Sequence, residues 1–456
     1  RVYDISTFRH PGGSVIRSYL NVDATNAFKQ FHYRSKTAER YLKNLPSQPL
    51  DEVKSLLPKE KQQMSALEKD FITLTEELAK EGWFKPSIPH VLYRISEVII
   101  MFIVGFYLLN AGYVMPGLLF IGLTGGRAGW LQHEGGHRSL TGNDIFDKFV
   151  QDWAIGFGAI ISGYKWNIMH NKHHAAPQRE GYDLDLETIP LVAFYQDVLR
   201  KSKRINITAK WWIRYQHYSF FIWTSAANAL FWHFYLHPKE YIINKFRPMP
   251  VLAIGARYAV HLYITVPMMG WFWGLMTLYF SIFVTSSYLF TNFALNHTHL
   301  PVVPKDKPKS WVEYCFDHTM DIKPHLVTDW WMGYLNYQIL HHLWPNMPQF
   351  RQGALVDRLK KFAKDHKMTY IQQGYFEAFG TTFRNLKTIA GKADRLIEHK
   401  KKWGFGQNFM FAALVAIPFT IFMLGFSKAA VGDVQSLFVQ TYIAEFRFPT
   451  HIIGEI

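Results

Sequence analysis

The chain has almost no cysteine, since Cys315 is the only one among 456 residues. A single thiol forms no disulfide within the chain, which excludes a disulfide-stabilised scaffold. Metal sites built from several thiolates are excluded for the same reason. Acidic residues are also few, 35 against 50 lysines and arginines, which leaves a net charge of +15. This excess favours an anionic partner, either nucleic acid or an anionic membrane face.

Apolar and aromatic residues are plentiful, at 49% and 17% of the chain. This content excludes an intrinsically disordered protein. No segment has the pattern of a nucleic-acid-binding module, and long apolar runs favour the membrane as the anionic partner. The chain starts at Arg1 rather than at a methionine, and we expect it to be a fragment whose true N-terminus is missing.

Four apolar runs organise the chain, and each is long enough to cross a hydrocarbon core of about 30 Å. Short breaks join them in two pairs, which predicts two transmembrane hairpins. Buried core helices are the alternative, because polar residues interrupt the first two runs. The four predicted spans are residues 91–109, 114–131, 252–275 and 276–295.

The polar segments around these spans complete the predicted organisation. Residues 1–48 are soluble in character, and residues 49–90 form a linker with a charged, exposed helix. Both hairpins begin and end on one face, where basic segments gather, and the positive-inside rule makes this face cytosolic. We expect residues 301–395 to form a cytosolic cap. Residues 396–456 are an atypical tail whose apolar run at 409–426 could form a fifth span.

Three clusters among the 21 histidines have the spacing of metal ligands. Residues three or four apart lie on one face of a helix, so their rings point the same way. A further histidine stands at the cytosolic end of the fourth apolar run. In chain order these residues are His133 and His137; His170, His173 and His174; His297; and Gln338, His341 and His342.

The number of histidines predicts two metal ions, because one tetrahedral zinc ion takes only four ligands. Imidazole ligands without thiolates suit iron, copper, nickel or zinc. An iron pair could activate dioxygen, whereas a zinc pair could only activate water. A single cluster of this kind is more often a set of surface or core histidines. Three clusters beside apolar runs argue against that alternative.

Two histidines near the N-terminus indicate a second cofactor. His10 precedes Pro11-Gly12-Gly13, and His32 follows 22 residues later in an aromatic segment. Two histidines can ligate haem iron axially, and glycines beside one of them let the backbone approach the macrocycle. An electron carrier fused to an oxygen-activating metal site is chemically coherent.

Together these motifs resemble the front-end fatty acid desaturases, in which a cytochrome b5 domain precedes a membrane desaturase with three histidine boxes. The segment from His10 to Gly13 is similar to the haem-binding motif, and His32 to the second axial ligand. The three clusters match the three boxes in order, and Gln338 marks the third box of front-end and related b5-fused enzymes. The resemblance covers residues 1–395. It implies a mainly α, multi-span membrane fold with cytosolic boxes, preceded by an N-terminally truncated α+β cytochrome b5-like domain.

The resemblance also implies a reaction and its partners. The enzyme would place a cis double bond between an existing one and the carboxyl end of a polyunsaturated fatty acyl chain, with delta-5, delta-6 or delta-8 selectivity. Two iron ions and haem b would be its cofactors. Its substrate would be a fatty acyl-CoA or a phospholipid acyl chain, and NADH-cytochrome b5 reductase would supply electrons. It would lie in the endoplasmic reticulum membrane with its active site facing the cytosol, and it would bind no nucleic acid.

The resemblance carries over roles for individual residues. The seven box histidines would ligate iron, His297 would supply the remaining ligand, and Gln338 would ligate weakly or hold a water. Asp183 and Asp185, just after the second box, would orient imidazoles. Three alternatives stay open: a sphingolipid long-chain-base desaturase, a membrane zinc hydrolase, and a non-catalytic haem-bearing electron carrier.

Overall fold

The structure is a computed structural model that describes residues 1–53, 64–186, 188, 192–201, 213–221, 232–236, 239, 247–307 and 309–397. The described part is mainly helical. All but the first two residues of the predicted tail 396–456, including the run 409–426, lie outside the described residues.

The N-terminal residues form a small unit of their own. Strand β1 (Val2–Tyr3) pairs antiparallel with β2 (Ser47–Gln48) and so brings the two ends of the unit together. Between them lie a 3-10 helix, η1 (Gly13–Tyr19), and the helices α1 (Thr25–Phe31) and α2 (Lys36–Asn44). This arrangement has the mixed α and β character that the haem motif led us to expect.

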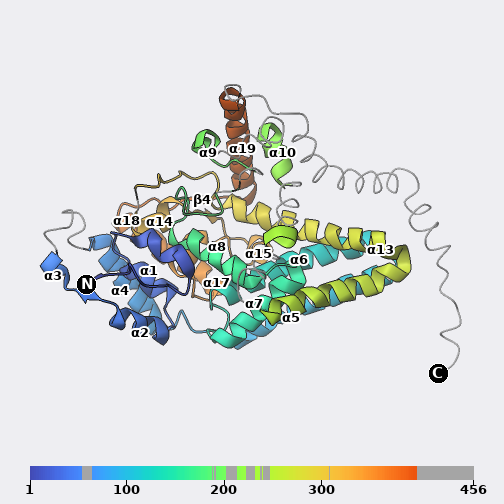
Figure 1. The fold of residues 1–456 in the computed structure, drawn as a ribbon, viewed down its shortest axis with the longest axis horizontal. Helices are drawn as coiled ribbons and strands as arrows, with labels where there is room; N and C mark the ends of the chain where they lie inside the picture. Colours follow the sequence, from blue (N-terminus) through green and yellow to red (C-terminus); the bar gives the residue numbers. More distant parts are fainter. Residues whose placement is uncertain are drawn as a thin grey trace.

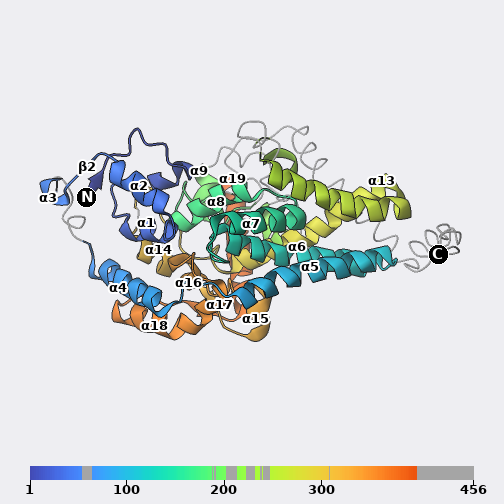
Figure 2. The same ribbon diagram turned by 90° about the horizontal axis from the view of Figure 1, so that it is seen from below.

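Four long helices form an elongated bundle beside this unit (Figures 1 and 2). They are α5 (Ile88–Asn110), α6 (Val114–Gly136), α7 (Asp144–Ala159) and α13 (Pro248–Leu295). The first two occupy the first pair of apolar runs, and the turn between them contains Gly112 at a φ of 87°. Helix α6 continues without a break as far as Gly136, so the first histidine box lies at its C-terminal end, with His137 as the C-cap residue.

Helix α13 is a hairpin of two helices rather than one rod. Its chain reverses at Gly270, whose φ of 75° and ψ of 169° favour glycine. The two halves then run back along each other, and His261 Nε2 lies 3.1 Å from Thr277 Oγ1. The sequence predicted this hairpin, with the two runs meeting at Trp271–Trp273, and the reversal lies directly before that segment, at Gly270. The predicted span boundary at 275–276 falls a few residues too late, because hydropathy does not register the glycine that permits the reversal.

A line of glycines lets α6 approach the second half of α13 closely. A Cβ atom on Gly122 would collide with Val284, one on Gly125 with Thr285, and one on Gly129 with Leu289. Small residues at such spacing allow the backbones of apolar helices to come close together. This contact holds the C-terminal end of α6 beside the end of α13, and both ends carry site histidines.

Shorter elements cover the end of the bundle nearest the N-terminal unit. Helices α8 (Gly163–Ala175) and α16 (Gln338–Leu343) carry the second and third histidine boxes. Strands β3 (Asp321–Ile322) and β4 (Gln372–Gln373) pair in parallel. The other described helices are α3 (Leu50–Val53), α4 (Ala66–Glu81), α9 (Gln196–Lys201), η5 (Ile213–Tyr215), α10 (Gln216–Ser219), η7 (Trp232–Leu236), α14 (Trp311–Asp317), α15 (Leu326–Trp331), α17 (Gln349–Gln352), η8 (Gly353–Leu355), α18 (Val356–Asp365) and α19 (Tyr375–Ile397).

Two of the described helices, α5 and the α13 hairpin, are long and apolar enough to cross a membrane. Helix α6 is not one of them, although its run 114–131 was predicted to span. Apolar side chains project outward from the bundle, including Ile103 on α5 and Trp271 at the tip of α13. That tip and the N-terminal unit lie at opposite ends of the longest axis (Figure 1).

Candidate di-iron centre

The eight predicted ligand histidines come together from four places in the fold. Helix α6 brings the first box, α8 the second and α16 the third, while His297 follows the end of α13. All eight are buried, none being more than 7% exposed. Buried polar groups normally have a partner. There are too few carboxylates nearby to pair with each of these imidazoles, so a shared metal partner is indicated.

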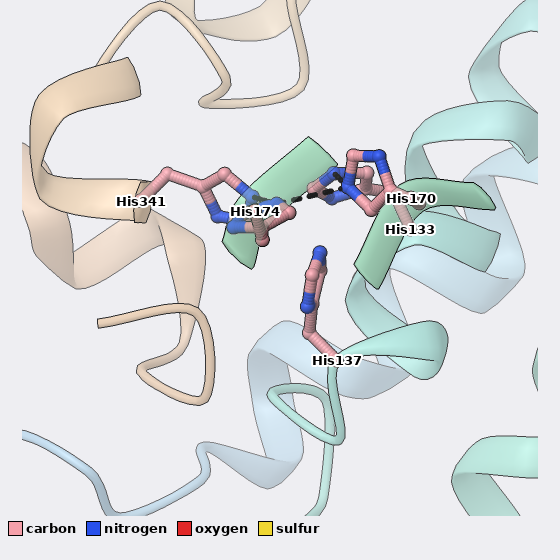
Figure 3. A group of neighbouring side chains, drawn as sticks. All are labelled: His133, His137, His170, His174 and His341. Carbon is pink, nitrogen blue, oxygen red and sulfur yellow. Dashed lines mark hydrogen bonds between the residues drawn. The ribbon is translucent and has the colours of Figure 1, made fainter. Parts of the chain in front are cut away.

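Five of the eight rings form a first group, shown in Figure 3. Their nearest ring nitrogens all lie within 4.8 Å of one another. Neighbouring Nε2 atoms are separated by 3.0 Å, 3.0 Å and 3.1 Å. Nitrogens bound at right angles to one ion, at about 2.1 Å, are about 3.0 Å apart, so this packing fits a shared metal. The five are His133, His137, His170, His174 and His341.

The other three rings, His173, His297 and His342, form a second group with the same close approach. Gln338 belongs beside it, because its Nε2 lies 2.9 Å from Nε2 of His297. The two groups adjoin, since the rings of His174 and His342 are stacked with their centres 4.1 Å apart. Groups of five and three fit two neighbouring ions, the number that the ligand count predicted.

Burial lowers the pKa of every ligand imidazole except that of His173, and so keeps these seven rings neutral. Burial, aided by Arg138, lowers the pKa of His137 to about 3. Burial, aided by His173, does the same for His297. A neutral imidazole has a free lone pair, which a metal ion requires. These two rings are therefore ready to bind metal without first losing a proton at neutral pH.

His173 has a different environment, set by the two aspartates that follow the second box. Its Nδ1 lies 3.0 Å from an oxygen of Asp183 and 3.6 Å from one of Asp185. Burial disfavours a charge on this ring, but the two carboxylates outweigh burial and raise its pKa to about 9. A carboxylate on Nδ1 leaves Nε2 for a metal and makes it a stronger donor.

Gln349 of α17 is a site residue that the sequence did not reveal. Its side-chain Nε2 lies 2.7 Å from Nδ1 of His133. That contact occupies Nδ1, so Nε2 is the nitrogen of His133 that faces the other rings. Gln349 is completely buried. No spacing signal could have found it, because a single glutamine outside the boxes reaches the site only through the fold.

Glu134, between the two histidines of the first box, anchors that box to α5. It accepts a hydrogen bond of 2.9 Å from Nε of Arg94, and both side chains are fully buried. Arg94 also approaches Glu97 at 3.3 Å, and Glu97 in turn pairs with Arg127 at 2.9 Å. The polar residues that interrupted the first apolar run are therefore the members of one internal ion network.

The N-terminal unit places its two motif histidines opposite each other. The ring centres of His10 and His32 are 6.0 Å apart. Two imidazoles on opposite sides of one iron, each bound at about 2 Å, have ring centres about 6 Å apart. Nδ1 of His10 accepts from the N–H of Gly12, and Nδ1 of His32 contacts the carbonyl of Phe28. The 6.0 Å separation of the two rings is the observation by which the residues present fit haem.

The fold and the site thus define a class of protein. It is a helical enzyme with two adjacent metal sites built from histidines, preceded by a haem-binding unit. The family profile "Fatty acid desaturase" matches residues 82–374, and "Cytochrome b5-like Heme/Steroid binding domain" matches residues 1–47. The chain belongs to the fatty acid desaturase family, in its front-end branch with a fused cytochrome b5 domain. Haem and a di-iron centre are the cofactors of this domain pair.

Curated relatives with related names cover nearly the whole chain. An acyl-lipid (8-3)-desaturase of Rebecca salina is 42% identical over 401 residues, 87% of this chain and 92% of the relative. A protein of the same name from Thraustochytrium sp is 39% identical over 409 residues, 85% and 90% of the two chains. A delta(8)-fatty-acid desaturase of Euglena gracilis is 27% identical over 428 residues, 87% and 95% of the two chains.

Proposed function

We propose that this enzyme inserts a cis double bond between an existing double bond and the carboxyl end of a polyunsaturated acyl chain. The observation that carries the proposal is the division of eight buried histidines into adjacent groups of five and three. One polypeptide combines this centre with a cytochrome b5-like unit. Dioxygen chemistry on an unactivated hydrocarbon needs a redox-active metal centre and a supply of electrons, and this chain has ligands for both a metal pair and a haem.

The reaction removes one hydrogen from each of two neighbouring methylene groups. Dioxygen takes up these two hydrogens together with two electrons and two protons, and leaves as two molecules of water. When bound, the iron pair supplies the activation of dioxygen. We assign its ligation to His133, His137, His170, His174 and His341 at one ion and to His173, His297 and His342 at the other, with Gln338 beside the second. His10 and His32 would hold the haem.

The surroundings of the histidines serve the same chemistry. Asp183 and Gln349 occupy the outward nitrogens of His173 and His133, which sets the direction in which each ring presents Nε2. Burial of all eight rings keeps bulk water away from the groups that would hold the metal. The chain thereby holds its ligands in one geometry before substrate arrives, which limits reorganisation during the reaction.

We further propose that the helix bundle spans the endoplasmic reticulum membrane and that the site faces the cytosol. Helices α5 and α13 support a membrane location by their length and apolarity. Exposed apolar side chains such as Leu92 and Ile103 on α5, and Tyr263 and Trp271 near the α13 tip, would contact lipid. NADH-cytochrome b5 reductase would then reach the haem unit from the cytosol. Residues 1–48, 49–90 and 91–395 would form the haem domain, linker and desaturase domain.

The names of the relatives support a finer proposal about the substrate. The relatives at 42% and 39% identity are both named acyl-lipid (8-3)-desaturases. Relatives named for delta(5), delta(6) and delta(8) activity are 26–28% identical. We therefore propose that a lipid-bound acyl chain, rather than acyl-CoA, is the substrate, with (8-3) selectivity.

Expression in yeast tests these proposals. Cells are fed linoleic acid and, separately, C18 and C20 polyunsaturated acids, and mass spectrometry locates each new double bond. New polyunsaturated product, found first in phospholipid, supports the proposals, and product found first in acyl-CoA contradicts the lipid-bound substrate. A desaturated long-chain base alone would show a sphingolipid enzyme instead. Loss of product in His170→Ala with an intact haem spectrum would argue against a non-catalytic haem protein.

A further inference from the structure

The haem unit, hereafter the haem domain (residues 1–48), contacts the chain just beyond the first histidine box through Arg34. Nη1 of Arg34 donates a hydrogen bond of 2.6 Å to the backbone carbonyl of Arg138. Arg34 is two residues from His32, and Arg138 directly follows His137. This hydrogen bond, together with the backbone and side-chain bonds on either side of it, joins the chain next to a haem ligand to the chain next to a ligand of the five-histidine group.

The place that Arg34 occupies is shaped to receive it. Its Nη2 donates a second hydrogen bond of 2.6 Å, to the carbonyl of Phe84 just before α5. Its guanidinium fills the space that a Cβ atom on Gly142 would take. A planar guanidinium with two carbonyl partners is held in one orientation. Arg34 therefore fixes both the distance and the angle between the two domains at this point.

The other two histidine boxes are contacted by the haem domain in the same way. The hydroxyl of Tyr19 donates a hydrogen bond of 2.7 Å to the carbonyl of Ala175, which directly follows His174. The side-chain amide of Asn346, four residues beyond His342, donates to the carbonyl of Gln30. The haem domain thus touches the chain just beyond each of the three boxes.

Packing and buried polar contacts make this docking a fixed interface. Ala27 of α1 belongs to the hydrophobic core that contains Trp311, and Phe31 packs edge-on against Trp311 with ring centres 5.2 Å apart. Asn26 donates to the side chain of the buried Glu68 on α4. A tethered domain that docked only in passing would not share a core with its partner.

We propose that Arg34 is a positioning residue for electron transfer, which locks the haem domain over the three boxes and completes the connection from His32 to His137. This inference rests on the proposed desaturase function. Each double bond requires two electrons, which leave NADH as it is oxidised to NAD⁺ and pass one at a time through the haem. They end in the water formed from dioxygen. A fixed interface removes the encounter step that a mobile tether would need before each transfer.

The test compares Arg34→Met, Arg34→Lys and the control Arg40→Met in the full chain loaded with haem and iron. Arg40 is exposed, and among the residues that the structure describes its side chain bonds to Thr37 of the same helix. Stopped-flow spectroscopy follows haem reduction by NADH and its reductase, and then haem reoxidation with acyl substrate and dioxygen. We expect equal reduction rates in all four proteins. Reoxidation should slow at least tenfold in Arg34→Met, less in Arg34→Lys, and by less than twofold in the control.

Hydrogen–deuterium exchange gives a second measurement that needs no turnover. Amides of residues 24–34 should exchange faster in Arg34→Met than in wild type or in Arg40→Met. Unchanged reoxidation and unchanged exchange in Arg34→Met would overturn the inference, as would equal slowing by the control. If Arg34→Met fails to bind haem, the reoxidation rate of Arg34→Lys tests the inference instead. A normal rate in that variant would contradict the need for both guanidinium hydrogen bonds. Failure of the wild type to make any product would contradict the proposed function. The hydrogen–deuterium exchange result would still test whether Arg34 fixes the haem domain in place.

Discussion

Arg94→Met should strongly destabilise the enzyme, because it leaves the carboxylate of Glu134 buried in the helix bundle without its arginine partner. Arg94 and Glu134 are both fully buried and bond at 2.9 Å. Glu97 keeps Arg127 as a partner at 2.9 Å after the change. Among the described residues, Glu134 would then keep His90 as its partner, at 3.5 Å. Removing one member of a buried pair costs about 3–5 kcal/mol, mostly through the charge left behind.

The assay is denaturant or thermal unfolding of the purified protein in detergent micelles. The double variant Arg94→Met/Glu134→Gln removes both charges and should recover more than half of the loss, because a neutral pair of similar volume is far less costly to bury. Iron content should fall in the single variant, since Glu134 lies between two histidines of the first box. A loss below about 1 kcal/mol, or a double variant no more stable than the single one, would refute the reasoning.

Three further predictions concern other parts of the molecule. Asp183→Asn should weaken iron binding by the three-histidine group about 10–100-fold. The measurement is the iron lost during dialysis, and an equal loss of iron in Asp185→Asn would contradict a specific role of Asp183. Gly125→Ala should lower the free energy of unfolding by about 1–3 kcal/mol, because the added methyl group forces α6 and α13 apart. In the control Gly255→Ala the new methyl group meets no atom within 4 Å, so this variant should keep its stability. Similar melting temperatures of the two variants would contradict the close packing. Burial raises the pKa of Glu68 above its ordinary 4.5. The free energy of unfolding should therefore fall as the pH rises through the pKa that Glu68 has in the folded protein, and Glu68→Gln should make this pH dependence weaker. Parallel pH curves for the two proteins would contradict a contribution of Glu68.

Spacing within the sequence predicted which histidines would gather. Residues three and four apart on a helix share a face whatever the tertiary fold, so each box could be recognised from local sequence alone. His297 was found from its place at the end of an apolar run. The division into groups of five and three was not predictable, because His173 and His174 are neighbours in sequence but point to different groups.

Contacts between distant segments account for what the sequence could not show. Gln349 reaches His133 across more than two hundred residues, and no local pattern marks either Gln349 or Arg34. The polar residues Arg94 and Glu97 were visible as interruptions of an apolar run, but their partners lie on other helices. Tertiary pairing decides such contacts, and a hydropathy pattern contains no information about it.

Metal analysis of the purified full chain tests the central claim most directly. Inductively coupled plasma mass spectrometry counts the metals, and the haem measured by its absorbance is subtracted from total iron. Two adjacent histidine groups in a desaturase predict two non-haem iron ions per chain and no stoichiometric zinc. Two zinc ions with no iron would contradict the account, because zinc could activate water but not dioxygen.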